Sequence, residues 1–141
     1  MSSPDYSQLV DQLRKNFKDG VMRSPEARIK QLQQLHLMFA SHEDEFYQAL
    51  QKDLRKCKSD TNVAELLPVK LELLNAMQNL STWMAPVKAD SQPIDTCELR
   101  AEPLGVVLII PTWNYPIQLL FMPLVGALAA GALFVFFLMN K

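Results

Sequence analysis

Residues 105–138 read GVVLIIPTWNYPIQLLFMPLVGALAAGALFVFFL, and this stretch decides the fold class. It begins with a β-branched run at 105–110 that Pro111 ends, a pattern typical of a strand buried on both faces of a parallel sheet. After the loop PTWNYP, the apolar residues 117–131 are numerous enough for a helix, and LFVFFL at 133–138 predicts the next strand. Strand, loop, helix and strand make one βαβ unit, which predicts a right-handed crossover and a parallel sheet.

The same region is set apart by its lack of charge. The chain has 14 Lys and Arg and 15 Asp and Glu, yet none of these residues, and no His, occurs from Pro103 to Asn140. Such a run suits a buried core or a membrane segment. Elsewhere acids and bases are interleaved, and the net charge of −1 leaves no basic patch for nucleic acid. Nucleic-acid binding is therefore not expected.

The residues before this region predict helices. Apolar residues at three- and four-residue spacing indicate a first helix over about 6–19. Ser24 before Pro25 is a strong start signal for a second helix, because the serine oxygen can accept a backbone N–H and proline at the first helical position has none. Ser41, with an acid three residues later, resembles a capping box and is expected to begin a third helix.

A fourth helix is predicted to begin at Asp60 or Thr61 and to run to Trp83. Pro68 within it predicts a kink or a later start, because its ring removes one helical hydrogen bond. Its buried side is expected to consist of apolar residues at helical spacing: Val63, Leu67, Leu71, Leu74, Met77 and Leu80.

These elements predict an α/β fold in which the chain divides into three regions. An N-terminal helical region covers 1–86. The second region, 87–104, is a connecting segment. We expect a loop over 86–93 and an extended edge segment over 94–102. The third region, 105–141, holds the start of the βαβ unit.

Residues 101–131, AEPLGVVLIIPTWNYPIQLLFMPLVGALAAG, resemble the aldehyde dehydrogenase superfamily. The family pattern in this region is Glu-Pro-x-Gly-Val, a strand, Trp-Asn-x-Pro, a helix and Ala-Leu-Ala-Ala-Gly. The preceding half is similar to the class 3 branch of fatty and aromatic aldehyde dehydrogenases, at Leu13, Arg14, Phe17, Gly20, Arg28, Ala49, Leu50, Asp53, Leu54, Glu65, Trp83 and Met84. The resemblance implies a Rossmann-type NAD(P)-binding domain, of which this chain holds an incomplete first βαβ portion after the N-terminal helices.

The resemblance also implies roles for the loop before the apolar helix. Asn114 matches the residue whose side-chain amide binds the oxyanion formed when a cysteine thiolate attacks the aldehyde. A preorganised neutral donor suits that charge, and losing one costs about 3 to 4 kcal/mol in comparable sites. Four positions match residues that line NAD or NADP, largely through their backbone: Ile110, Pro111, Thr112 and Trp113. From the residues alone, this loop is also a good turn and helix start, with Asn114 or Tyr115 near the cap.

The sequence departs from the family pattern after Gly131. There the family continues with Asn, a strand and Lys-Pro-Ser-Glu, whose Lys and Glu hold the adenosine ribose, so Lys141 receives no such role. The general-base glutamate and the nucleophilic cysteine of the family lie farther along than this chain extends. The resemblance thus implies NAD(P)-dependent oxidation of aldehydes to carboxylic acids, with this chain a truncated fragment that is expected to be inactive alone.

Local residues do not replace the missing groups. Cys57 lies in the lysine-rich C-terminal end of a predicted helix, whose dipole disfavours a thiolate, and Cys97 lies beside acids that also disfavour one. His36 and His42 are about 240° apart around a helix, so no metal site is predicted.

Two alternative functions stay open at this point. One is a helical protein with a membrane anchor over 117–139, since this apolar segment is long enough for a bilayer core of about 30 Å. The other is a non-catalytic module that associates with itself or with a full-length relative, because a small sheet leaves free edges and an uncovered apolar face. The lack of a secretory signal and of a disulfide framework predicts a cytoplasmic location, with the endoplasmic reticulum membrane as the alternative.

Overall fold

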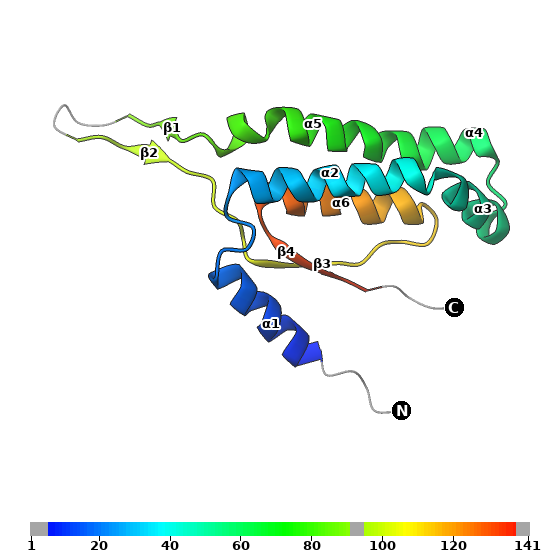
Figure 1. The fold of residues 1–141 in the computed structure, drawn as a ribbon, viewed down its shortest axis with the longest axis horizontal. Helices are drawn as coiled ribbons and strands as arrows, with labels where there is room; N and C mark the ends of the chain where they lie inside the picture. Colours follow the sequence, from blue (N-terminus) through cyan, green and yellow to red (C-terminus); the bar gives the residue numbers. More distant parts are fainter. Residues whose placement is uncertain (1–5, 91–94, 138–141) are drawn as a thin grey trace.

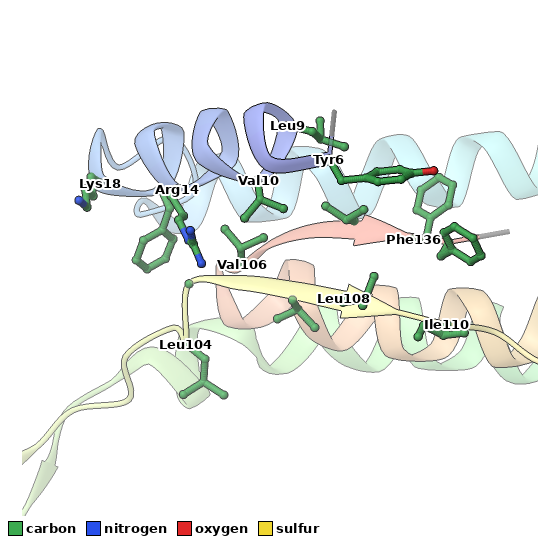
Figure 2. Close-up of a pocket in the computed structure, with 15 residues that line it drawn as sticks. Tyr6, Leu9, Val10, Arg14, Lys18, Leu104, Val106, Leu108, Ile110 and Phe136 are labelled. Atoms are coloured by element: carbon green, nitrogen blue, oxygen red, sulfur yellow. The ribbon is translucent and has the colours of Figure 1, made fainter. Parts of the chain in front are cut away.

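The computed structural model describes residues 6–90 and 95–137 as helices with two small sheets. In chain order the elements are α1 (Tyr6–Lys18), α2 (Pro25–Ser41), α3 (Glu43–Leu54), α4 (Lys58–Thr61), a π-helical turn (Asn62–Leu66), α5 (Leu67–Met84), β1 (Val87–Lys88), β2 (Glu98–Leu99), β3 (Val106–Ile109), α6 (Pro116–Ala130) and β4 (Leu133–Phe136). The helices α2, α5 and α6 pack against one another (Figure 1). The strands β3 and β4 lie between α6 and α1 (Figure 2).

The predicted βαβ unit is present. β3 and β4 pair in parallel, with Val106 opposite Leu133 and Ile109 opposite Phe136, and α6 joins them. α6 ends at Ala130 and is followed by Gly131, whose φ of 79° lies in the left-handed region that favours glycine at a helix C-terminus. β4 ends at Phe136, and residue 138 of the predicted strand lies outside the described residues.

The start of α2 agrees with the sequence pattern, whereas the start of α3 does not. The Ser24 hydroxyl oxygen accepts the N–H of Ala27 at 3.1 Å, and Pro25 is the first helical residue. Ser41 is instead the last residue of α2, and its hydroxyl donates to the carbonyl oxygen of Leu37 at 2.8 Å. A serine inside a helix readily bonds the carbonyl four residues earlier, which removes its oxygen from capping the next helix.

The fourth predicted helix also begins earlier than expected. Cys57, not Asp60 or Thr61, is at the N-cap position, and its sulfur accepts the N–H of Asp60 at 3.4 Å. The π-helical turn at Asn62–Leu66 then precedes Pro68, which lies in the first turn of α5. Pro68 therefore does not delay the helical segment, which begins at Lys58; it follows the π-helical turn and lies in the first turn of the regular helix α5.

The predicted buried side of that helix was wrong at four of its six positions, because Val63, Leu67, Leu71 and Leu74 are exposed. Leu80 is buried as predicted and Met77 packs partly buried against the core, and the other buried residues are Leu66, Val69, Leu73 and Ala76. A π-helical turn holds more residues than an α-helical turn, so the side chains before it are rotated relative to those after it. This rotation places Glu65 in the interior.

A short antiparallel ladder lies beyond α5. β1 and β2 pair with Val87 opposite Leu99. The loop predicted at 86–93 thus contains a strand, and only part of the extended segment predicted at 94–102 is one. Residues 91–94 lie outside the described residues.

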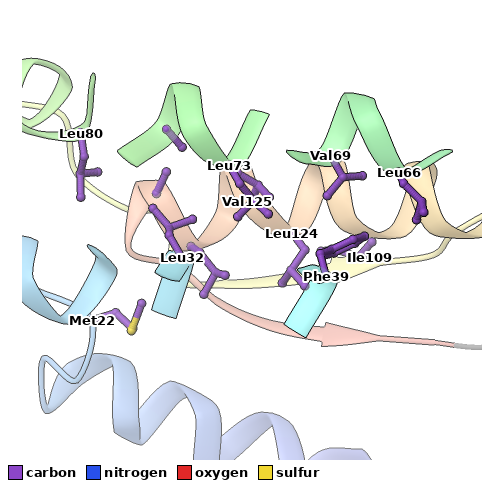
Figure 3. Packing of buried hydrophobic residues seen from close by; sticks show 13 residues of the cluster. Met22, Leu32, Phe39, Leu66, Val69, Leu73, Leu80, Ile109, Leu124 and Val125 are labelled. Carbon is purple, nitrogen blue, oxygen red and sulfur yellow. The ribbon is translucent and has the colours of Figure 1, made fainter. Parts of the chain in front are cut away.

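One apolar core joins the helices to the βαβ unit (Figure 3). Its fully buried side chains come from α2, the π-helical turn, α5 and α6: Leu32, Phe39, Leu66, Val69, Leu73 and Val125. Ile109 of β3 reaches the same core. The helical region and the βαβ unit therefore share one interior, and the division of the chain into three regions stays a prediction.

The sheet is covered unequally on its two faces. Ile109 is 5% exposed against α6, whereas the neighbouring Leu108 is 59% exposed on the opposite face. The prediction of a strand buried on both faces was therefore wrong for this chain, because α1 covers only part of the second face (Figure 2).

The segment 117–139 does not form the single helix that a membrane anchor requires. α6 ends at Ala130 and β4 follows, while residues 138 and 139 lie outside the described part. In residues 6–90 and 95–137, no helix combines the length and hydropathy needed to cross a bilayer.

Candidate functional site

The predicted site residues lie together in the loop between β3 and α6. This loop follows the carboxyl end of a parallel strand, where ligands bind in open α/β sheets. Asn114 and Thr112 are exposed, and the Thr112 hydroxyl donates to Oδ1 of Asn114 at 2.6 Å. Since Oδ1 accepts this hydrogen bond, Nδ2 is the donor that the Asn114 amide offers to a ligand. Ile110 and Trp113 are 61% and 70% exposed, and Pro111 is half-buried.

A buried carboxylate holds the start of α6. Glu65, in the π-helical turn, is fully buried, and its Oε2 accepts the N–H groups of Ile117 and Gln118 at 3.0 Å each. These belong to the free N–H groups of the first helical turn, where a negative charge is stabilised. Glu65 therefore caps α6 from a distant part of the chain. Tyr115 stands at the N-cap position, and its side chain makes no capping hydrogen bond.

Lys56 connects this carboxylate to the loop. Its ammonium group pairs with Oε1 of Glu65 and donates to the backbone oxygen of Asn114 at 2.9 Å. The ammonium also lies 3.8 Å from the centre of the Tyr115 ring. Glu65 and Lys56 thus hold both the helix and the residue two positions before it. The expectation that Asn114 or Tyr115 lies near the cap of α6 is confirmed for Tyr115, but the side chain that accepts the free N–H groups is that of Glu65.

Sequence reasoning gave no role to Glu65 or Lys56. Glu65 matched the family pattern, which was its only signal, because a glutamate is almost never fully buried unless it is paired. The predicted helix register placed it on the outside. Lys56 carried no signal of its own, because lysines are usual near helix ends.

The other end of α6 is held by a buried arginine. The Arg28 guanidinium donates to the backbone oxygens of Ala129 at 3.1 Å, Met22 at 2.9 Å and Arg23 at 3.3 Å. Burial lowers the pKa of Arg28, and the charge of Glu102 partly offsets this. An arginine remains protonated at neutral pH even so, and it satisfies a carbonyl that the helix C-terminus leaves free.

A groove of about 900 Å³ lies between α1 and the open face of the β3–β4 sheet (Figure 2). Its apolar walls come from α1, β3, β4 and the residue that follows β3, and include Leu9, Val10, Phe17, Leu108, Ile110 and Phe136. Arg14 and Lys18 lie at one end of the groove, and Ile110 and Phe136 lie at the other. The sequence predicted an uncovered apolar face on a small sheet but not this groove, because the groove depends on how α1 crosses the sheet.

The cysteines and histidines take no part in this loop's hydrogen bonds. Cys57 caps α4 rather than ending a helix, so the dipole argument used for it from the sequence was wrong. Cys57 and Cys97 are both exposed free thiols. Across residues 6–90 and 95–137, no cluster of three or more His, Cys, Asp or Glu is arranged to hold a metal ion.

Sequence comparison identifies the relatives of this chain. The family model described as "Aldehyde dehydrogenase family" matches residues 1–136. Aldehyde dehydrogenase family 3 member H1 of Arabidopsis thaliana is 40% identical over 132 residues, which is 92% of this chain and 27% of that protein. Aldehyde dehydrogenase family 3 member B1 of Mus musculus is 40% identical over 129 residues, 89% of this chain and 28% of that protein.

Solved structures share the fold. Staphylococcus aureus AldH in its substrate-bound state superposes with a TM-score of 0.90 and 29% identity, over 96% of this chain and 30% of that one. Succinic semialdehyde dehydrogenase from Streptococcus pyogenes, in complex with NADP⁺ as the cofactor, gives a TM-score of 0.78 at 15% identity over the same shares. The chain therefore spans under a third of the length of the proteins that it matches.

Proposed function

Because this chain belongs to the aldehyde dehydrogenase family, we propose that it supplies the oxyanion donor and one wall of the cofactor site of an NAD(P)-dependent aldehyde dehydrogenase. The reaction oxidises an aldehyde to a carboxylic acid. The observation that carries the proposal is the attachment of the Asn114 loop to the buried pair of Glu65 and Lys56. A cytoplasmic location remains a prediction.

Asn114 is the donor in this proposal. When a thiolate adds to the aldehyde, negative charge moves onto the aldehyde oxygen, and an amide N–H held in place stabilises that charge without reorganisation. The hydrogen bond from Thr112 to Oδ1 orients the amide so that Nδ2 is the free donor. Lys56 holds the backbone of the same residue. Glu65 balances the charge of Lys56, so the loop is held by a pair with no net charge.

The cofactor would lie against the four residues before Asn114. Ile110 and Trp113 present exposed apolar surface at the carboxyl end of β3, which suits the flat face of a nicotinamide ring. Thr112 offers its backbone, and Pro111 offers no N–H, so this wall has one donor fewer at that position. Bound NAD(P)⁺ would supply the acceptor for the hydride that leaves the substrate. The residues of this chain bind and orient; they do not themselves accept the hydride.

We infer that the chain alone does not complete the reaction. Neither exposed thiol takes part in the hydrogen bonds that hold Asn114, and Cys57 is engaged by its sulfur in the cap of α4. Purified chain with an aldehyde and NAD⁺ or NADP⁺ should give no increase in absorbance at the wavelength of the reduced cofactor. Aldehyde-dependent formation of NAD(P)H that Asn114→Ala abolishes would contradict this inference.

The catalytic role is testable in a fused enzyme. Residues 1–131 of this chain would replace the matching region of the Arabidopsis relative, and kcat and KM would be measured for an aldehyde. We expect Asn114→Ala to lower kcat about 100- to 1,000-fold with little change in KM, the usual cost of one oxyanion donor. Asn75→Ala, at an exposed position on α5, is the matched control and should leave kcat unchanged. Equal activity of the two variants would refute the role of Asn114.

A further inference from the structure

A second cavity lies at the other end of α6 from the Asn114 loop. Here the start of α2 and the ends of α5 and α6 meet (Figure 1). The cavity has a volume of about 250 Å³, and Gly126, Ala129 and Ala130 of α6 line one part of it. A Cβ added at Gly126 would meet nothing within 4 Å, so this part of the cavity is open space. Pockets for drug-sized ligands measure roughly 300 to 1,000 Å³, so this one suits a smaller molecule.

A buried guanidinium lines the cavity with donors to spare. Arg28 is 6% exposed, and three of its N–H groups donate to the carbonyl oxygens of Met22, Arg23 and Ala129. A guanidinium has more N–H groups than these three bonds use. Burial lowers the pKa of Arg28 and the charge of Glu102 partly offsets this, yet within the described ranges no hydrogen bond or ion pair joins the two side chains. A carboxylate is the group that best completes such a site, because it can accept two N–H groups at once.

Two carboxylates line the same cavity and are largely unengaged. Glu72 accepts one long hydrogen bond of 3.5 Å from Asn75, and Glu102 takes part in no hydrogen bond or ion pair in the part of the chain that the structure describes. The C-terminal end of α6 adds a partial negative charge nearby. An ammonium group is favoured beside these acceptors. A simple anion would be repelled by the two glutamates, and a simple cation would leave the spare donors of Arg28 unused.

The remaining wall is apolar. Trp83 is 46% exposed and Met84 is half-buried, and both line the cavity. Covering this wall with an aliphatic group removes apolar surface from water and favours binding by about 25 cal/mol per Å². The matching ligand therefore carries a negative charge, a positive charge and a compact aliphatic group.

We propose that this cavity binds a small aliphatic α-amino acid as its zwitterion. The carboxylate pairs with Arg28, the ammonium group faces Glu72 and Glu102, and the side chain lies against Trp83 and Met84. An α-amino acid holds both charges on one carbon atom, which suits a cavity this small. The proposal goes beyond the proposed function and does not depend on it, because none of the side chains that hold the Asn114 loop lines the cavity.

Isothermal titration calorimetry of the full chain with L-valine, L-leucine and L-methionine tests the proposal. Two compounds divide leucine into its charges: 4-methylpentanoate lacks the ammonium group, and 3-methylbutylamine lacks the carboxylate. L-leucine should bind at least about tenfold more tightly than either, because each leaves polar groups of the cavity without a partner. No amino acid binding with a Kd below about 10 mM would overturn the proposal. Equal binding of leucine and one of the two compounds would overturn it as well.

Two substitutions place the binding in the cavity. Gly126→Leu fills the open space and should abolish leucine binding, and it should not impair folding, because leucine is a better helix former than glycine. Ala40→Leu, at an exposed position of α2 outside the cavity, is its matched control and should bind leucine as the wild type does.

Glu102→Gln tests the contact with the ammonium group. It should weaken leucine binding about twofold to fivefold, the usual value of an exposed charge pair, while binding of 4-methylpentanoate should not weaken. Glu45→Gln, at an exposed position of α3, is the matched control and should have no effect. Circular dichroism checks that every variant folds. Leucine binding that is unchanged in Gly126→Leu or in Glu102→Gln would overturn the proposal.

Discussion

Glu65→Gln tests how strongly the buried carboxylate holds the Asn114 loop. Glutamine has nearly the same shape, and its side-chain oxygen can still accept the N–H groups of Ile117 and Gln118. What the substitution removes is the charge that pairs with Lys56, and it places an NH2 donor beside the ammonium where Glu65 has an acceptor. The Lys56 side chain is only 12% exposed. Removing one partner of a buried pair costs about 3 to 5 kcal/mol, because the other charge stays buried and unpaired. The retained hydrogen bonds favour the lower end, about 3 kcal/mol.

Urea unfolding followed by circular dichroism measures this loss. Because small domains are stable by only about 5 to 15 kcal/mol, a loss of about 3 kcal/mol moves the unfolding midpoint clearly. Lys56→Met should also destabilise, and the double variant should be more stable than the sum of the two single losses predicts. The amides of Ile117 and Gln118 should exchange faster with solvent in Glu65→Gln. A loss below about 1 kcal/mol, or additive losses, would refute the account of the pair.

Two further predictions concern the helix ends and the response to alkaline pH. Gly131→Ala should destabilise the fold by at least about 2 kcal/mol, because φ is positive there and a Cβ would lie 2.5 Å from Cζ of Arg28. Gly126→Ala is the control: this residue lies inside α6 with open space around it, and its substitution should stabilise the fold by about 0.5 to 1 kcal/mol. Thermal melts of the two variants compare them directly, and equal shifts would contradict the packing described for Arg28. Burial and the hydrogen bond to Glu43 raise the pKa of Tyr47 to about 12 from its ordinary 10.0, so its stabilising contribution is complete below pH 10 and is lost as pH rises towards 12. Tyr47→Phe should therefore lose less stability than wild type between pH 10 and 12 in urea titrations, and parallel profiles would count against this coupling.

The βαβ unit could be predicted because its signals are local. The β-branched run, the loop with Asn114 and the small residues before Gly131 are each read within a few positions. The serine cap of α2 is local in the same sense. Such features can be predicted from the sequence because neighbouring residues alone determine them.

The support of the site could not be predicted because it is not local. Glu65 lies 52 and 53 positions before the two amides that it caps, and the π-helical turn that directs it inwards has no sequence signature comparable to a cap. The exposure of Leu108 was missed for a different reason. A β-branched run predicts a strand that is covered on both faces, but within these 141 residues only one face of β3 is fully covered, so Leu108 is exposed.

The kcat of the fused enzyme in a double-mutant cycle between Lys56→Met and Asn114→Ala tests the central claim most directly, which is that Lys56 positions the oxyanion donor. If Lys56 acts through Asn114, Lys56→Met lowers kcat in the parent but changes it little once Asn114 is alanine. The pattern should hold at a temperature where all variants are folded. Two reductions that simply multiply would mean that Lys56 and Asn114 act independently, and would contradict the account.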